Sequence, residues 1–178
     1  MRNGRCRRRT AFTLVEILIV VLVLMIAAAI VIPNIGSAGD SRVTAATRIL
    51  QADMEVARSL AMRTQQPHSV VFRPPDFQSY KVVANYVENY VGVPYAQVPA
   101  VDHPVKRGQP FEVTVGALNG MDGVQILGPN FGGQSYLTFK SLGDPVAAGS
   151  VNLRSGNIEM TVLVEGLTGI ITVPPAGG

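Results

Sequence analysis

Cysteine, histidine and tryptophan are scarce in this chain of 178 residues, which has one cysteine, two histidines and no tryptophan. The cysteine is Cys6, so the rest of the chain has no thiol for a disulfide, a cysteine-based metal site or a nucleophile. His68 and His103 lie far apart in the sequence, and solitary loop histidines are usually solvated side chains. A Gly-x-Ser-x-Gly elbow, a glycine-rich phosphate loop and EF-hand spacing are also missing. We therefore expect no enzyme activity, no metal and no cofactor.

Positive charge is scarce outside the first residues. Five of the fifteen Lys and Arg side chains lie within the first nine positions, namely Arg2, Arg5, Arg7, Arg8 and Arg9. Without the first eleven residues, ten basic side chains remain against twelve acidic ones, a net charge of −2, although the whole chain carries +3. A net-acidic domain does not attract the phosphate backbone, so we expect no nucleic-acid partner.

One long apolar segment follows the basic residues. Residues 17–32 are sixteen apolar positions without interruption, and residues 12–32 together would form a helix of about 31 Å. This length matches the hydrocarbon core of a membrane, which is roughly 30 Å thick. The arginines before it favour a cytoplasmic N-terminus, with the C-terminal part on the other side of the membrane. We therefore predict a transmembrane helix over residues 12–32.

Glu16 places a carboxylate at the head of this apolar segment. An acidic side chain at the centre of a membrane helix costs roughly 2.5 to 3.5 kcal/mol. An ordinary signal peptide, cleaved at the small residues 27–29, would not need this carboxylate, and neither would an uncleaved single-pass anchor. Because both alternatives leave Glu16 unexplained, we interpret it as a functional residue.

The order of basic leader, small residue, Phe-Thr-Leu-Val-Glu and long apolar helix closely resembles the class III signal of type IV prepilins and type II secretion pseudopilins. The resemblance implies that a prepilin peptidase cuts between Ala11 and Phe12 and methylates the new amine of Phe12. It also implies that Glu16 is needed for assembly and that Pro33 is the helix-kinking proline found in many pilins. Ala11 departs from the family pattern, which usually has glycine before the cut.

The amine of Phe12 and the carboxylate of Glu16 would be opposite charges, and each alone would be stranded in lipid. At about 4 Å and an effective dielectric near 20, such a pair is worth on the order of 4 kcal/mol before desolvation is subtracted. In a filament, Glu16 of an incoming subunit can neutralise the N-terminus of a subunit already in place.

A second helix is predicted after Pro33. Residues 34–39 indicate a loosened stretch, and Asp40 or Ser41 can cap a renewed helix. Apolar side chains then recur at steps of three and four residues, which is typical of an amphipathic helix that packs on a folded domain. They are Val43, Ala46, Leu50, Met54, Ala57 and Ala61.

From residue 65 onwards the apolar period changes from about 3.6 to 2, which predicts short strands separated by Gly, Pro and Asn. The expected strands contain Val70/Phe72, Tyr80/Val82, Phe111/Val113/Val115, Val124/Ile126, Leu137/Phe139, Val151/Leu153, Ile158/Met160/Val162/Val164 and Ile171/Val173. The last three should form a continuous antiparallel meander. We predict a pilin-like α+β fold, in which a long N-terminal helix, first transmembrane and then amphipathic, packs on an all-antiparallel β-sandwich-like domain.

The predicted organisation has four segments. They are the cleaved leader 1–11, the transmembrane or filament-core helix 12–32, the kink and amphipathic helix 33–64, and the β-rich periplasmic domain 65–178. Within that domain, residues 85–110 are expected to form a long irregular segment with three tyrosines. These tyrosines either form an interface with a partner or cover the sheet.

The closing strands resemble those of H-type pseudopilins and the related FimT/FimU minor pilins, with Phe139, a Gly143-to-Pro145 turn and a final Thr-Gly-hydrophobic strand. The resemblance implies a minor pseudopilin of a type II secretion system, a structural subunit near the tip of the periplasmic pseudopilus that helps drive protein secretion. Its partners would be the prepilin peptidase, other pilins or pseudopilins, the inner membrane and secreted cargo. The alternative is a minor type IV pilin that acts in pilus assembly or DNA uptake.

Overall fold

The structure is a computed structural model and describes residues 13–31 and 37–174. Two compact units divide the chain, one up to Ala38 and the other from Gly39 onwards. The helices and strands are α1 (Leu14–Val31), α2 (Ser37–Thr64), β1 (His68–Phe72), β2 (Ser79–Ala84), α3 (Tyr86–Asn89), β3 (Glu112–Thr114), β4 (Val124–Phe131), β5 (Tyr136–Phe139), β6 (Gly149–Ser155), β7 (Ile158–Val164) and β8 (Ile171–Thr172).

Helix α2 supplies one side of the core of the second unit. The six apolar residues predicted from the helical period are all buried, with at most 1% of each residue exposed. The predicted amphipathic stripe is therefore confirmed. The helix begins earlier than predicted, at Ser37, so the prediction that Asp40 or Ser41 caps it is wrong. Asp40 instead lies in the first turn, where a carboxylate stabilises the positive end of the helix dipole.

The strands form two four-stranded antiparallel sheets. The first sheet has the order β3-β2-β1-β5 and the second has the order β4-β6-β7-β8. All eight predicted strands are present, and β6, β7 and β8 are consecutive neighbours, so the predicted meander is confirmed. The strands could be predicted from the period-2 pattern of apolar residues, because alternate residues of each strand face the core.

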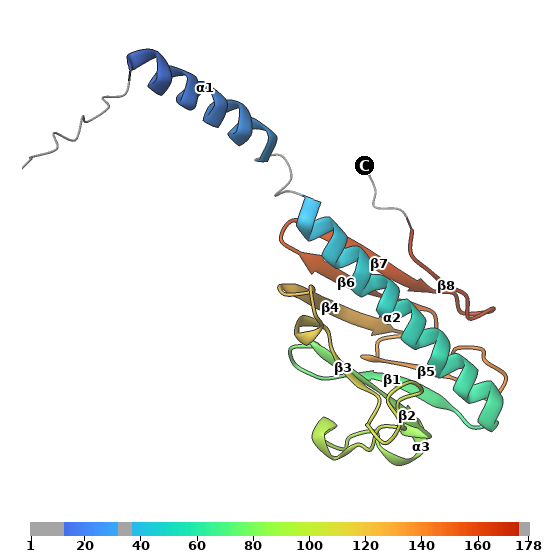
Figure 1. The fold of residues 1–178 in the computed structure, drawn as a ribbon. Helices are drawn as coiled ribbons and strands as arrows, with labels where there is room; N and C mark the ends of the chain where they lie inside the picture. Colours follow the sequence, from blue (N-terminus) through green and yellow to red (C-terminus); the bar gives the residue numbers. More distant parts are fainter. Residues whose placement is uncertain (1–12, 32–36, 175–178) are drawn as a thin grey trace, which may run out of the picture. The chain divides into compact units, whose positions relative to one another are not determined.

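One hydrophobic core joins α2 to both sheets. It contains the buried stripe of α2 together with inward-facing residues of β1, β2 and β5 from the first sheet and of β4, β6 and β7 from the second. The ring of Phe72 in β1 stacks on Phe131 in β4, with ring centroids 6.3 Å apart. Figure 1 shows α2 running across the strands of both sheets. The predicted α+β class is confirmed, and the helix is an integral part of the sandwich-like core.

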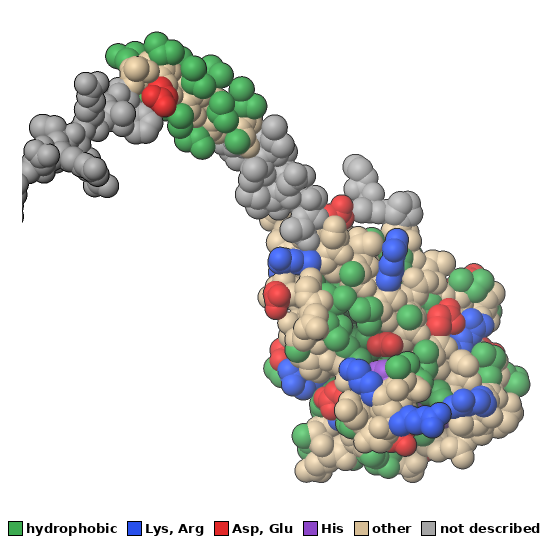
Figure 2. Space-filling view, in the orientation of Figure 1, with side chains coloured by type: hydrophobic (Ala, Val, Ile, Leu, Met, Phe, Trp, Pro, Cys, Tyr) green, Lys and Arg blue, Asp and Glu red, His purple; other side chains and the backbone are tan. Residues whose placement is uncertain are grey.

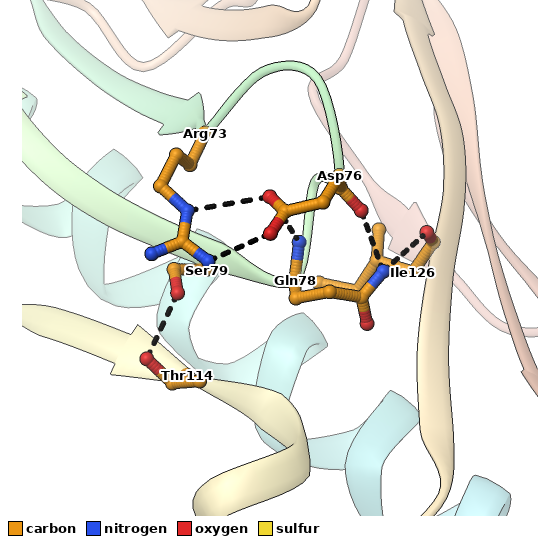
Figure 3. Close-up of polar contacts among 6 residues, drawn as sticks. All are labelled: Arg73, Asp76, Gln78, Ser79, Thr114 and Ile126. Atoms are coloured by element: carbon orange, nitrogen blue, oxygen red, sulfur yellow. Dashed lines mark hydrogen bonds and ion pairs between the residues drawn. The ribbon is translucent and has the colours of Figure 1, made fainter.

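A short turn between β1 and β2 also links the two sheets (Figure 3). The Arg73 guanidinium donates to both carboxylate oxygens of Asp76, at 3.2 and 2.8 Å, and this lowers the pKa of Asp76. Gln78 Nε2 then donates to the backbone oxygen of Ile126 in β4, at 3.4 Å. The turn therefore contacts the second sheet as well as the first.

Strand β4 continues through a Gly-Pro pair that usually ends a strand. The pairing of β4 with β6 shifts register between Leu127 and Asn130, the positions on either side of Gly128 and Pro129. A bulge of this kind accommodates a proline, because the bulged residue does not need to donate to the ladder. The strand consequently extends to Phe131, beyond the two apolar residues, Val124 and Ile126, from which it was predicted.

The partly buried carboxylate of Asp53 predicts a pH effect on stability. Burial raises the pKa of Asp53 above its ordinary value of 3.8, while the hydrogen bond from the Tyr80 hydroxyl (2.6 Å) and the charge of His103 oppose the rise. A carboxyl group with a raised folded-state pKa destabilises the fold above that pKa, and this cost disappears as the pH falls towards 3.8.

We therefore expect Asp53→Asn, which keeps an acceptor for Tyr80 but does not titrate, to be more stable relative to the wild type at pH 7 than at pH 4. Thermal unfolding of both proteins across this range measures the difference, in which the contributions of the other carboxylates cancel. A difference in melting temperature that does not change with pH would contradict the assigned pKa direction.

Candidate assembly helix and domain surface

The first turn of α1 is closed by a side-chain cap. Thr13 precedes the first helical residue, and its hydroxyl oxygen accepts a hydrogen bond from the backbone N–H of Glu16 at 3.2 Å. Thr-x-x-Glu is the spacing of a capping box, which satisfies backbone donors that have no partner within the helix. Sequence reasoning missed the role of Thr13, although this spacing was visible in the sequence.

Glu16 is the only charged side chain of α1. Every other residue of the helix is apolar, and the exposed fractions from Leu14 to Ile26 lie between 45% and 81%. Figure 2 shows hydrophobic side chains covering the visible surface of this helix. A helix that is apolar on all sides requires an apolar environment around it, either lipid or other helices.

The structure describes only part of the predicted leader and anchor. Glu16 lies in the first turn of α1, as expected. Ala11, Phe12 and Pro33 lie outside the described residues, and so do both ends of the predicted transmembrane segment 12–32. Within residues 13–31 and 37–174, no helix is both long enough and apolar enough to cross a membrane.

The expectation that the histidines are solvated loop side chains is wrong for His68, whereas His103 lies in a loop and is half-buried. His68 lies in β1, is 3% exposed, and its Nδ1 lies 3.0 Å from the backbone oxygen of Gln66. His103 packs against the Phe111 ring, and its Nδ1 accepts from the N–H groups of Val105 and Lys106. Both histidines are thus engaged in local structure. Over the described residues, no three His, Cys, Asp or Glu side chains are grouped closely enough to hold a metal ion.

The tyrosines of segment 85–110 cover the first sheet. Tyr86, Tyr90 and Tyr95 pack with Val71 and Val83 in a second hydrophobic cluster, on the face of the sheet that points away from the main core. Tyr86 also contacts Tyr136 edge-on, with ring centroids 5.0 Å apart. Of the two interpretations of these tyrosines, the structure therefore favours the one in which they cover the sheet.

A buried lysine attaches the same segment to the sheet. Lys81 in β2 is 4% exposed, and its ammonium donates to the backbone oxygens of Tyr95 and Val98 at 3.0 and 3.1 Å. It also lies 4.0 Å from the centre of the Tyr95 ring and 3.7 Å from a carboxylate oxygen of Glu112. Sequence reasoning missed this contact, because the strand pattern only predicts that Lys81 points away from the core.

The N-terminal region matches a known family model, the prokaryotic N-terminal methylation motif, over residues 6–32. This match covers the second half of the basic leader, the Phe-Thr-Leu-Val-Glu sequence and the apolar segment. A search of curated proteins with the whole sequence finds no match.

Solved structures resemble this chain over about three quarters of its length. The type IV minor pilin FimU of Pseudomonas aeruginosa superposes with a TM-score of 0.53 and 13% identity, over 77% of this chain and 91% of that one. The minor pseudopilin EpsH of the Vibrio cholerae type II secretion system superposes with a TM-score of 0.55 and 10% identity, over 77% of this chain and 98% of that one. At these identities the likeness concerns the fold.

An N-terminal methylation motif together with a minor-pilin-like fold is the combination expected from the resemblance to type IV pilin-like proteins. The resemblance predicted from the sequence is therefore confirmed at this level. Within that class, the chain has the fold shared by a minor pilin and a minor pseudopilin.

Proposed function

We propose that this chain is a minor pseudopilin of a type II secretion system, a structural subunit near the tip of the pseudopilus and not an enzyme. The observation that carries the proposal is the joint presence of the N-terminal methylation motif over residues 6–32 and a minor-pilin-like fold over 77% of the chain. A leader of this kind is expected in a protein that is cleaved by a prepilin peptidase and then assembled into a filament. The likeness to EpsH supports the secretion system as the setting.

In this function, the prepilin peptidase cuts between Ala11 and Phe12 and methylates the amine of Phe12. Glu16 then has a cationic partner available, the N-terminus of a neighbouring subunit. The apolar surface of α1 packs first against lipid in the inner membrane and later against the helices of other subunits. The unit from Gly39 onwards lies in the periplasm, where it meets other pseudopilins and secreted cargo.

Intact mass and N-terminal analysis of protein isolated from membranes test this proposal. We expect a chain that begins at Phe12 and carries one methyl group on its amine. A chain that begins at Ile30 would establish an ordinary signal peptide, and a chain that begins at Met1 would establish an uncleaved anchor. Either result would overturn the proposed function.

A minor type IV pilin is the second candidate, because FimU resembles this chain about as closely as EpsH does. Both functions predict the same processing, so the phenotype of a deletion strain has to separate them. Loss of protein secretion with normal twitching motility and DNA uptake supports the pseudopilin. Loss of motility or DNA uptake with normal secretion supports the pilin.

A further inference from the structure

Strand β7 has an open edge. It pairs with β6 along its whole length, from Ile158 to Val164. On its other side it pairs with β8 at two positions only, Leu163 with Thr172 and Val164 with Ile171. Figure 1 shows β8 as a short strand beside one end of β7. The first half of β7 therefore has a strand on one side only within the described residues.

The outward-facing backbone groups of this edge can be assigned from the ladder. In an antiparallel pair, alternate residues direct their N–H and C=O groups to the same neighbour. Glu165 N donates to Ile170 O at 3.0 Å, so the odd-numbered residues of β7 face the side of β8. Glu159 and Thr161 consequently direct their backbone groups to the open edge. Across the described residues, no backbone hydrogen bond occupies those groups.

Proline explains why β8 does not cover this edge. If the register of β8 continued, residue 174 would lie opposite Thr161. That residue is Pro174, which has no N–H to donate, and Pro175 follows it. Proline is excluded from the interior of a ladder for this reason. Pro174 thus stops β8, and among the described residues the first half of β7 has no second neighbouring strand.

A groove with one positive charge runs beside the open edge. It measures about 460 Å³, and it lies between Thr44, Arg48 and Gln51 of α2 and residues of β7 and β8 that include Met160. Arg48 is exposed and forms no ion pair with any described side chain. The carboxylate of Glu159 belongs to the opposite face of the sheet from Met160, because side chains alternate along a strand, and it accepts a hydrogen bond from Asn152 Nδ2 at 2.7 Å. A ligand in the groove would therefore meet the Arg48 guanidinium, which has no acidic partner among residues 13–31 and 37–174.

We propose that the β7 edge binds an extended segment of a neighbouring pilin-like subunit, which adds as a strand beside Glu159 and Thr161 and directs a carboxylate towards Arg48. Strand addition fits, because an open edge presents a row of unpaired donors and acceptors that another backbone can satisfy. A neighbouring subunit is a suitable source of this segment, because the first half of α2 lines the groove and α2 follows the candidate assembly helix α1 in the sequence. This docking rests on the proposed function, since neighbouring subunits exist only if the chain assembles.

Hydrogen exchange of the full processed chain, in detergent and within purified filaments, tests the docking. In detergent we expect rapid exchange at the amides of Glu159 and Thr161 and slow exchange at Met160 and Val162, which face β6. In filaments the two edge amides should slow by about tenfold or more. Edge amides that stay rapid in filaments containing the chain would overturn the docking alone. Absence of the chain from filaments would contradict the proposed function, and the docking with it.

The chain's own tail is the competing occupant of the edge. If Glu159 and Thr161 are already protected in detergent and lose this protection when residues 175–178 are deleted, the tail occupies the edge and the proposal is wrong. Protection that is absent in detergent and appears only in filaments supports a neighbouring subunit.

Two matched pairs of variants separate the backbone contribution from the charge contribution. Thr161→Pro removes an outward N–H without removing a bond to β6, whereas Thr161→Val changes only the side chain. Arg48→Glu reverses the charge in the groove, whereas Arg63→Glu reverses a charge in the last turn of the same helix.

We expect Thr161→Pro and Arg48→Glu each to reduce incorporation of the chain into filaments about fivefold to tenfold, and Thr161→Val and Arg63→Glu to leave it unchanged. Thermal unfolding of all four checks the fold, and Arg48→Glu remains decisive if Thr161→Pro does not fold. Equal incorporation within both pairs would overturn the proposal.

Discussion

Replacing Glu16 with alanine is expected to abolish incorporation of the chain into filaments while leaving its membrane insertion intact. The substitution removes the only charge of α1, so the helix becomes more apolar and enters lipid at least as well. Assembly fails because the amine of a neighbouring N-terminus loses its anionic partner. A charge pair of this kind is worth on the order of 4 kcal/mol before desolvation, which corresponds to roughly a hundredfold to a thousandfold in an equilibrium constant.

Two further substitutions at the same position separate charge from helix capping. Glu16→Gln keeps the length and hydrogen-bonding capacity of the side chain but removes the charge, so it should fail as alanine does. Glu16→Asp keeps the charge on a shorter side chain and should retain part of the incorporation. Leu22→Met, on the same helix, conserves volume and charge and should assemble normally. Membrane fractionation and immunoblotting of sheared filaments measure the two steps. Normal incorporation of the alanine or glutamine variant would refute the charge-pairing mechanism.

Truncation of Leu50 to alanine is expected to cost about 2 to 5 kcal/mol of folding stability. Leu50 is fully buried in the middle of α2, within the core that contains strands of both sheets. Its removal loses apolar burial and leaves a cavity that a helix packed across both sheets cannot easily close. For a unit of this size we expect a drop in melting temperature of roughly 5 to 15 °C.

Met62 provides the matched control for Leu50. It lies on the same helix but is 42% exposed, so Met62→Ala should change stability by no more than about 0.5 kcal/mol. Circular dichroism of the purified full-length chain during thermal unfolding measures both variants. If Leu50→Ala and Met62→Ala unfold at similar temperatures, then α2 does not anchor the common core.

The repeating elements of this fold could be predicted because each follows a local rule. Apolar residues at three- and four-residue steps made one face of α2 visible, and all six of the predicted residues are buried. Alternation at period 2 located the eight strands in the same way. Neither prediction required knowledge of which strand pairs with which.

Elements that depend on contacts distant in sequence could not be predicted in this way. The start of α2 at Ser37 and the extension of β4 across Gly128 and Pro129 both run against local propensity. Segment 85–110 contains the short helix α3 and is attached to the sheet through Lys81. A strand pattern shows that Lys81 points away from the core but not that a loop returns to cover it.

The sequence by itself determined the N-terminal methylation motif. A basic leader, a small residue and a carboxylate at the head of an apolar helix form one continuous local pattern. It also determined the faces of α2 and of the strands, through hydrophobic periods that act over a few residues. Only the tertiary structure decided that the helix and two sheets share one core and that the tyrosines cover a sheet. It also decided that, among the described residues, the first half of β7 has an open edge. These features arise from strand order and from loops that pack across the sheets. The residues that they bring together lie far apart in the sequence, so no local pattern predicts the contacts.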